Sequence, residues 1–140
     1  MLIVFFTLWG FDAFIVHYST ILADFLPVSF RVFPAVLSLG FGVYLIMKAH
    51  AVVFSGHSQL IDVGVYAWVR HPMYLGTLLF CLGFFWLIPS LLALIIWIAF
   101  FVLYDKMATY EENDLRRILG KDYAVYQQQV PKWLPRPVKP

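Results

Sequence analysis

The residues best suited to chemistry fall into two short clusters, of which the first reads Arg-His-Pro-Met-Tyr at positions 70–74. Pro72 suits the first position of a helix, where its missing N–H would be unpaired in any case, so His71 stands at the helix cap. The free N–H groups of that first turn and the positive end of the helix dipole can bind a carboxylate or a phosphate. The alternative is an interfacial belt, in which Arg70 reaches lipid headgroups and nearby aromatic side chains anchor the helix.

The second cluster is the adjacent pair Glu111 and Glu112. Two neighbouring carboxylates where a chain leaves the lipid repel each other and are costly to desolvate unless a cation compensates them. Lys106, Arg116 and Arg117 are close in the sequence. A solvated helix end therefore accounts for the pair as well as a bound cation or amine does.

The composition places both clusters in a membrane protein. The chain has 140 residues, of which 62% are hydrophobic and 13% charged, and its mean hydropathy is +0.80. Soluble domains carry about 25% charged residues, and a small globule needs them to cover its surface. An ordinary soluble domain, a disordered chain and a nucleic-acid binder driven by basic charge are therefore excluded. The single cysteine, Cys81, allows neither an internal disulfide nor a Cys-based zinc site, and no metal site is expected.

The distribution of charge predicts four membrane helices. No Asp, Glu, Lys or Arg occurs from His71 to Tyr104, a run of 34 residues. As one helix this run would be about 51 Å long, against a hydrocarbon core of about 30 Å. Pro89 interrupts helix hydrogen bonding near its middle, so we expect a hairpin of two short spans. The expected spans cover 1–23, 29–47, 72–88 and 90–108, followed by a cytoplasmic tail over 109–140. Residues 1–140 are thus predicted to form one all-α domain, an integral membrane helical bundle without a Rossmann domain.

Two features inside these spans give no specific indication of a function. Asp12 and His17 interrupt the first span, and ionisable groups inside a membrane are often functional. They are five positions apart and share a helix face poorly, and the span can also start later. The Gly-Phe-Gly run at 40–42 superficially matches a nucleotide-binding motif, but it lies in an apolar span with no strand before it. Close helix packing is the expected role of these glycines.

Positive charge predicts the orientation of the chain. With both termini in the cytoplasm, the inner side holds Lys48, Arg70 and the seven basic residues of the tail, whereas the outer side holds Arg31 alone. The connection 48–71 and the tail then share the cytoplasmic face. Chemistry that uses a cytosolic cofactor belongs where these two segments meet.

The tail itself carries helical and turn signals. Gly120 is a good helix stop, and Tyr123 and Tyr126 share one face of the helical segment that follows. Residues 130–135 are amphipathic and punctuated by prolines. This last segment either folds back over the cytoplasmic opening or lies on the membrane surface.

Three stretches in this order, 64–76, the glutamate pair and 119–135, resemble the isoprenylcysteine carboxyl methyltransferase family and its bacterial and archaeal relatives. The phospholipid methyltransferases are more distant kin. The resemblance covers about half of the chain. It implies a membrane-embedded enzyme of a bacterial or archaeal inner membrane that uses S-adenosylmethionine (SAM), with the cofactor in a pocket under the cytoplasmic surface.

The resemblance also implies the site residues. Arg70 and Glu111 are the expected catalytic residues. The expected cofactor contacts are Gln59, Leu60, Ile61, Tyr66, His71, Pro72, Met73, Tyr74, Glu111 and Glu112. The chemistry of SAM agrees, because a helix N-terminus suits its carboxylate, a glutamate its ammonium or ribose hydroxyls, and aromatic faces its adenine or sulfonium methyl. Arg70 would polarise or hold an acidic acceptor, and methyl transfer would depend chiefly on orientation and desolvation.

The methyl acceptor and two alternative functions stay open. Met107 stands where the eukaryotic carboxyl methyltransferases carry a substrate-binding arginine, so the lipophilic or small acceptor is a carboxylate, a thiol or an amine. An NADPH-dependent enzyme similar to the sterol reductases is one alternative, which the glutamate pair disfavours. The other is a non-catalytic membrane subunit that keeps the overall structure of the family. The expected partners are the lipid bilayer and the acceptor, not nucleic acid, and a homo-oligomer is compatible with the sequence.

Overall fold

The chain forms an all-helical bundle, as the sequence predicts. The computed structural model describes residues 1–17, 19–55 and 60–134, and these contain helices and no strand. A π-helical turn extends the first helix, and a 3₁₀ turn precedes the fourth. The α-helices are α1 (Leu2–Phe11), α2 (Ile21–Phe25), α3 (Val28–Val53), α4 (Pro72–Leu87), α5 (Leu91–Leu119) and α6 (Lys121–Gln129).

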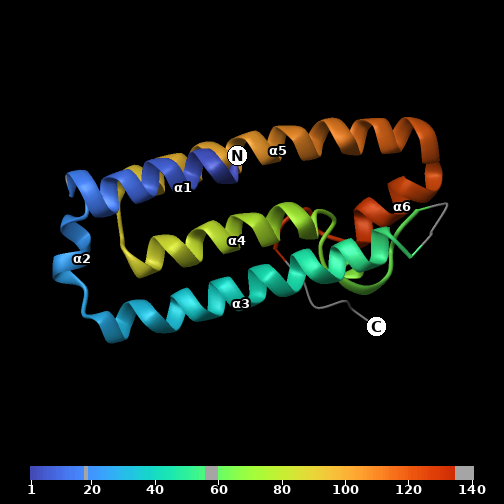
Figure 1. Cartoon of the computed structure of the whole chain (residues 1–140). Coiled ribbons are helices and arrows are strands. Elements are labelled where there is room, and N and C mark those ends of the chain that lie inside the picture. The colour runs from blue at the N-terminus through green and yellow to red at the C-terminus, as the bar shows by residue number, and fades with distance from the viewer. Residues whose placement is uncertain (18, 56–59, 135–140) are drawn as a thin grey trace.

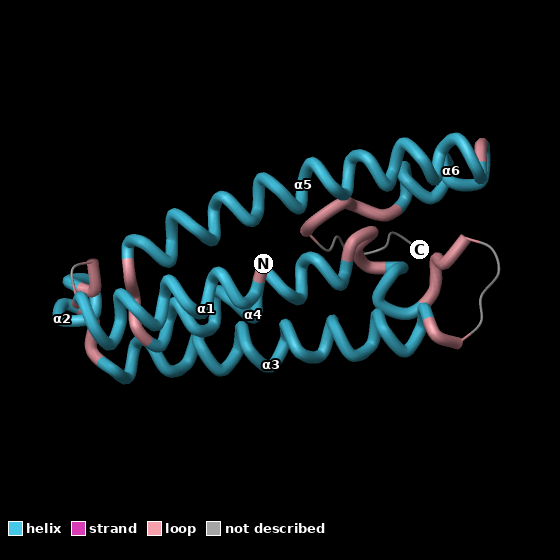
Figure 2. Tube along the Cα trace, turned by 45° about the horizontal axis from the view of Figure 1, so that its top comes forward, coloured by secondary structure: helices cyan, strands magenta, loops and turns pink. Residues whose placement is uncertain are grey.

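Helices α3, α4 and α5 run alongside one another with alternating direction (Figure 1). The shorter α1 starts midway along the bundle and covers only one half of it, as both views show (Figure 2). At one end of the bundle lie α2 and the turn between α4 and α5. At the other end, called the α6 end, the loop after α3, the start of α4, the last part of α5 and α6 come together. The two sequence clusters therefore meet at the α6 end.

Within the described residues, two helices are long and apolar enough to cross a membrane. These are α3, with 26 residues and a mean hydropathy of 1.8 over its most apolar 18 residues, and α5, with 29 residues and 2.0 over the same length. The segment Leu2–Val16 and α4 are shorter apolar helices. Four spans stay a prediction, and so does the boundary at residue 108. Because α5 continues without a break to Leu119, the glutamate pair lies within a helix rather than at its end.

The expected hairpin around Pro89 is confirmed. Helix α4 ends at Leu87 and α5 begins at Leu91. Ser90 caps α5, because its hydroxyl accepts a hydrogen bond from the Ala93 N–H at 3.2 Å. A serine at this position pairs one of the N–H groups that a helix leaves unpaired at its first turn.

The first expected span, 1–23, does not form one continuous helix. The π-helical turn Asp12–Val16 follows α1, and His17 then adopts a left-handed conformation with φ 53°. The Asp12 side chain is buried and accepts hydrogen bonds from the Ser19 N–H at 3.2 Å and from the hydroxyls of Ser19 and Ser90. The break has a physical reason: Asp12 pairs with donors of the following turn and of the α4–α5 turn, which a straight helix would not allow.

The glycines at 40 and 42 differ in their surroundings. A Cβ atom at Gly42 would lie 2.7 Å from the Gly76 carbonyl oxygen and 2.8 Å from the Phe80 nitrogen, both in α4. A Cβ atom at Gly40 would meet nothing within 4 Å. The expected packing role therefore holds for Gly42, where α3 and α4 cross closely, but not for Gly40.

We expect Gly42→Ala to lower the free energy of unfolding by about 1–3 kcal/mol, because the added methyl group would push the α3 and α4 backbones apart. Gly40→Ala is the matched control and should leave stability unchanged or raise it by less than about 1 kcal/mol through helix propensity. Denaturant unfolding of both variants in the same detergent micelles checks this. Equal midpoints for the two variants would contradict the close crossing.

Candidate functional site

The start of α4 is built as the sequence predicts. His71 is the N-cap residue and Pro72 occupies the first turn. The loop before it is fixed by Val69, which is fully buried, and by Val65, which packs with Leu45 and Ala49 of α3. The side chains of Arg70 and His71 are therefore held in defined positions where the loop enters α4.

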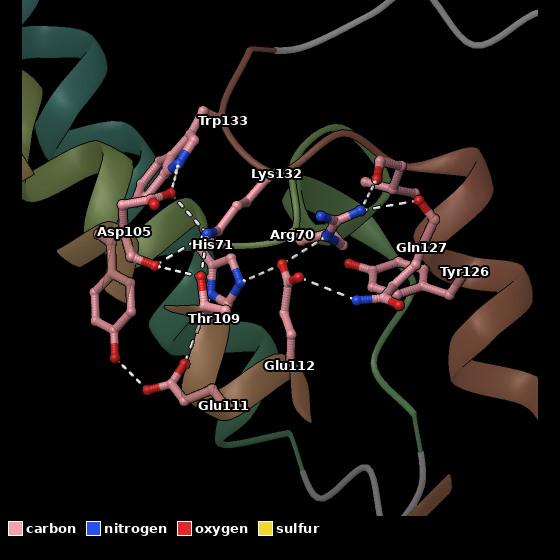
Figure 3. Close-up of polar contacts among 12 residues, drawn as sticks. Arg70, His71, Asp105, Thr109, Glu111, Glu112, Tyr126, Gln127, Lys132 and Trp133 are labelled. Carbon is pink, nitrogen blue, oxygen red and sulfur yellow. Dashed lines mark hydrogen bonds and ion pairs between the residues drawn. The ribbon is translucent and has the colours of Figure 1, made fainter. Parts of the chain in front are cut away.

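Glu112 is the centre of a buried polar network. Its Oε1 atom accepts hydrogen bonds from Arg70 Nε at 2.9 Å and lies 3.0 Å from His71 Nε2. Its Oε2 atom accepts from Gln127 Nε2 at 3.0 Å. Figure 3 shows the carboxylate between the imidazole on one side and the guanidinium and amide on the other. One carboxylate of α5 thus joins the start of α4 to α6.

Arg70 also forms hydrogen bonds with the end of α6 and with the residues that follow it. Its Nη1 donates to the carbonyl oxygens of Gln127 at 2.9 Å and Val130 at 2.8 Å. Its backbone N–H donates to the Pro131 carbonyl at 3.0 Å. These contacts are structural, and a direct contact between Arg70 and a methyl acceptor stays a prediction.

Glu111 points to the other side of α5. Its side chain is 49% exposed, against 11% for that of Glu112. Its Oε1 accepts a short hydrogen bond from the Tyr74 hydroxyl, and its Oε2 lies 3.6 Å from His71 Nδ1. The two adjacent glutamates therefore contact opposite edges of the same imidazole ring.

A cavity of about 590 Å³ lies at the α6 end on the Glu111 side. This volume falls within the range of about 300–1,000 Å³ that is usual for small-molecule sites. Glu112 does not line it, and Gln59 lies outside the described residues. The expected site residues that line it are Leu60, Ile61, Tyr66, Arg70, His71, Pro72, Met73, Tyr74 and Glu111.

Further lining residues were not expected as site residues. Leu115 and Leu119 follow Glu111 at intervals of four along α5, a helical spacing that could have identified them. Thr77 and Tyr104 line the cavity deeper in the bundle. No local pattern in the sequence connects these two residues, because only the packing of α4 on α5 brings them together.

Helix α6 contributes one wall of the cavity. Gly120, with φ +58°, separates α5 from α6 as expected. Tyr123 and Tyr126 share a buried face that packs with Val130, and both line the cavity. The Tyr126 hydroxyl donates to the Tyr66 carbonyl at 2.7 Å, which ties α6 to the loop before α4.

The described part of the segment after α6 folds back onto α5, whereas its position over a cytoplasmic opening stays a prediction. Lys132 Nζ lies 2.6 Å from Asp105 Oδ1 and 2.8 Å from Thr109 Oγ1. Trp133 Nε1 donates to the same Asp105 oxygen at 2.8 Å, and its ring lies 6.1 Å from the His71 ring. Residues 131–134 form a strap beside His71 that sequence reasoning did not locate.

Because the α6 tyrosines are buried, the packing of α6 against the rest of the protein is sensitive to alkaline pH. Burial raises the pKa of Tyr123 to about 12, and the charge of Glu112 adds to the effect. Burial likewise raises the pKa values of Tyr66 and Tyr126. The folded protein therefore keeps these phenol protons at pH values where the unfolded chain has lost them.

We expect the contribution of Tyr123 to the free energy of unfolding to be fully present below about pH 10. Between about pH 10 and pH 12 it should fall by about 1.4 kcal/mol per pH unit. Tyr123→Phe should reduce this loss, whereas Tyr110→Phe, at a tyrosine that is 72% exposed, should not. Thermal unfolding midpoints from neutral to alkaline pH measure the effect. Identical alkaline profiles for the two variants would contradict it.

The part of the chain that forms most of this site matches a known protein family. A family model described as "Phospholipid methyltransferase" matches residues 35–122, more than half of the chain. The matched stretch contains α4, the 70–74 cluster and both glutamates. The chain belongs to the phospholipid methyltransferase family.

Individual relatives carry isoprenylcysteine methyltransferase names, which confirms the resemblance in the sequence. Protein-S-isoprenylcysteine O-methyltransferase B of Arabidopsis thaliana is 31% identical over 80 residues, covering 56% of this chain and 41% of that protein. A probable protein-S-isoprenylcysteine O-methyltransferase of Oryza sativa subsp. indica is 31% identical over 106 residues, covering 72% and 52%. The protein-S-isoprenylcysteine O-methyltransferase of Tribolium castaneum is 33% identical over 88 residues, covering 58% and 29%.

The chain spans about half or less of the length of these relatives. They come from plants and an insect, so a bacterial or archaeal source for this chain stays a prediction. No solved structure gives a significant match.

Proposed function

We propose that the chain is a membrane-embedded SAM-dependent methyltransferase that acts on a lipophilic or small acceptor at the cytoplasmic face. Both termini and the α6 end would then lie on the cytoplasmic side, as the basic residues predict. The observation that carries the proposal is the cavity at the α6 end. It is lined by Glu111, His71 and several tyrosines, within the region that matches the family.

The lining chemistry fits SAM group by group. Glu111 offers a half-exposed carboxylate to the ammonium, and the start of α4 beside His71 offers N–H groups to the carboxylate. Leu115, Leu119 and Tyr123 form an apolar and aromatic wall for the adenine. When bound, SAM would supply an electrophilic methyl group on a sulfonium.

The residues of the chain would act by positioning and by excluding water. Tyr74 and Tyr104 stack with ring centroids 4.8 Å apart, and the face of either ring can stabilise a cation in the cavity. The deeper part of the cavity, at Thr77 and Tyr104, lies between helices with apolar outer faces. Holding two reactants in line inside such a site removes much of the entropic barrier to their reaction.

The acceptor would reach the cavity from the bilayer or from the cytoplasm. Helix α1 covers only the half of the bundle that is remote from the α6 end, so the outer faces of α4 and α5 near the cavity remain uncovered by it (Figure 1). This arrangement supports a lipophilic acceptor in particular.

Calorimetric titration of the detergent-solubilised protein with SAM, with its demethylated product S-adenosylhomocysteine, and with NADPH tests the proposal. We expect micromolar binding of the first two, unchanged by Tyr110→Phe, which alters an exposed neighbour of Glu111. Binding of NADPH without SAM would favour a reductase instead. Absence of binding by all three would favour a non-catalytic subunit.

A further inference from the structure

Resting on the proposed methyltransferase function, we infer that His71 accepts a proton from the methyl acceptor through Nδ1, while Glu112 orients the imidazole. The acceptor is then a nucleophile that carries a proton, a thiol or an amine, rather than a carboxylate. The inference follows from the contacts on the two edges of the His71 ring, from the charges around it, and from the cations available in the cavity.

The hydrogen bond to Glu112 fixes which nitrogen of His71 carries the proton. Glu112 receives donors from Arg70 Nε at 2.9 Å and Gln127 Nε2 at 3.0 Å, as an ionised carboxylate does. Because an ionised carboxylate can only accept, the contact of 3.0 Å with His71 requires a proton on Nε2. In the neutral imidazole, Nδ1 then has an available lone pair.

Nδ1 is the nitrogen that faces the cavity. It lies 3.6 Å from Oε2 of Glu111, a cavity-lining residue, whereas Nε2 faces Glu112, which does not line the cavity. A separation of 3.6 Å is too long for a hydrogen bond, so the contact with Glu111 does not place a proton on Nδ1. The ring is held between Tyr74, at 5.7 Å with planes 6° apart, and Trp133, at 6.1 Å. Figure 3 shows the ring between the two glutamates.

The charges around the imidazole allow it both to receive and to hold a proton. Arg70 pairs with Glu112, and Lys132 of the strap pairs with Asp105 of α5 at 2.6 Å. The Tyr74 hydroxyl donates to the remaining carboxylate, Glu111. Once the ammonium of SAM binds Glu111, each carboxylate near the ring has a cationic partner. After transfer, the imidazolium donates to Glu112 through Nε2, and this ion pair stabilises it.

The described lining of the cavity offers an acidic acceptor few basic side chains. Arg70 and His71 are the only basic side chains among its described lining residues. The Nε and Nη1 donors of Arg70 are bound to Glu112 and to two carbonyl groups. Position 107, one turn before Glu111, holds a methionine. A carboxylate acceptor would therefore find no basic side chain in the described lining that is not already paired with a carboxylate or a carbonyl group.

The transfer step balances with His71 as the base. A bond forms between the methyl carbon and the sulfur or nitrogen of the acceptor. The bond between that carbon and the sulfonium sulfur breaks, and its electron pair stays on the sulfur, which becomes a neutral thioether. The proton of the acceptor passes to Nδ1 and later to water. A carboxylate is already ionised at neutral pH and would need no such base.

Nitrogen NMR of isotope-labelled histidine in the S-adenosylhomocysteine complex tests the protonation state directly. At neutral pH we expect a protonated Nε2 and an unprotonated Nδ1 for His71, whose signal is identified by its loss in His71→Gln. A protonated Nδ1 overturns the inference. Calorimetry distinguishes this outcome from a failure of the proposed function. If the protein is not a methyltransferase, S-adenosylhomocysteine does not bind, whereas a protonated Nδ1 leaves its binding intact.

A panel of acceptors tests the predicted class. A long-chain alkanethiol, alkylamine and alkanoic acid of equal chain length are offered with methyl-labelled SAM in the same micelles. We expect label in the thiol or the amine. His71→Gln should slow turnover by about 100-fold or more, the usual effect of losing a general base, and weaken product binding far less. A methyl ester formed from the acid as the main product overturns the inference.

Discussion

Glu112→Ala is expected to lower the free energy of unfolding by about 3–5 kcal/mol, the usual cost of removing one partner from a buried ion pair. The side chains of Arg70 and Glu112 are only 12% and 11% exposed. Without the carboxylate, the guanidinium keeps its place beside the Gln127 and Val130 carbonyls as a buried charge without a counter-ion. Since whole domains are stable by about 5–15 kcal/mol, a loss of this size is a large share of the total.

The matched control for this change is Glu111→Ala, one position earlier on the same helix. Glu111 is half exposed and receives one side-chain hydrogen bond, from Tyr74, so its removal should cost less than about 1 kcal/mol. Unfolding of both variants by denaturant in one detergent gives the comparison. Equal losses of stability in the two variants would show that Glu112 does not hold the α6 end together.

A double variant separates the buried charge from the lost contact. In Arg70→Met with Glu112→Leu, both charges are replaced by apolar side chains of similar length. Such replacements are often neutral, so the double variant should be more stable than Glu112→Ala alone. If the double variant loses as much free energy of unfolding as Arg70→Met and Glu112→Leu lose together as single variants, the destabilisation does not come from an unpaired Arg70.

The two glutamates show what the sequence could and could not predict. The family resemblance led us to expect both to contact the cofactor and Glu111 to be catalytic as well, because no local pattern shows which member faces inward. Neighbouring residues on a helix point in directions about 100° apart, so only the packing of α5 decides. Glu111 lines the cavity, whereas Glu112 contacts Arg70, His71 and Gln127 behind it.

Local signals predicted the boundaries that depend on local chemistry. Pro72, the turn at Pro89 and Gly120 each mark a helix end where the structure has one. The strap could not be predicted in this way, because Lys132 and Asp105 are 27 positions apart and meet only after α6 has folded back. The break after α1 likewise depends on Ser90, which is 78 positions from Asp12 in the sequence.

Glu111→Gln is expected to weaken SAM binding by about 10- to 100-fold while leaving the fold intact. Hydrogen bonds to charged groups contribute about 1.5–3 kcal/mol, and about 1.4 kcal/mol corresponds to a factor of ten in affinity. The amide keeps the shape of the side chain and an oxygen that can accept from Tyr74. What it removes is the negative charge that we assign to the ammonium of SAM.

Calorimetry with S-adenosylhomocysteine and with its deaminated analogue identifies the cause of the loss. Against the wild type, Glu111→Gln should reduce affinity for S-adenosylhomocysteine but hardly change affinity for the analogue, which has no ammonium. Leu115→Ala, one turn further along the cavity wall, is the comparison variant and should weaken both ligands alike, because it removes only apolar contact. An equal loss for both ligands in Glu111→Gln would mean that this carboxylate does not bind the ammonium. Glu111 would then be confined to holding Tyr74 and facing Nδ1 of His71.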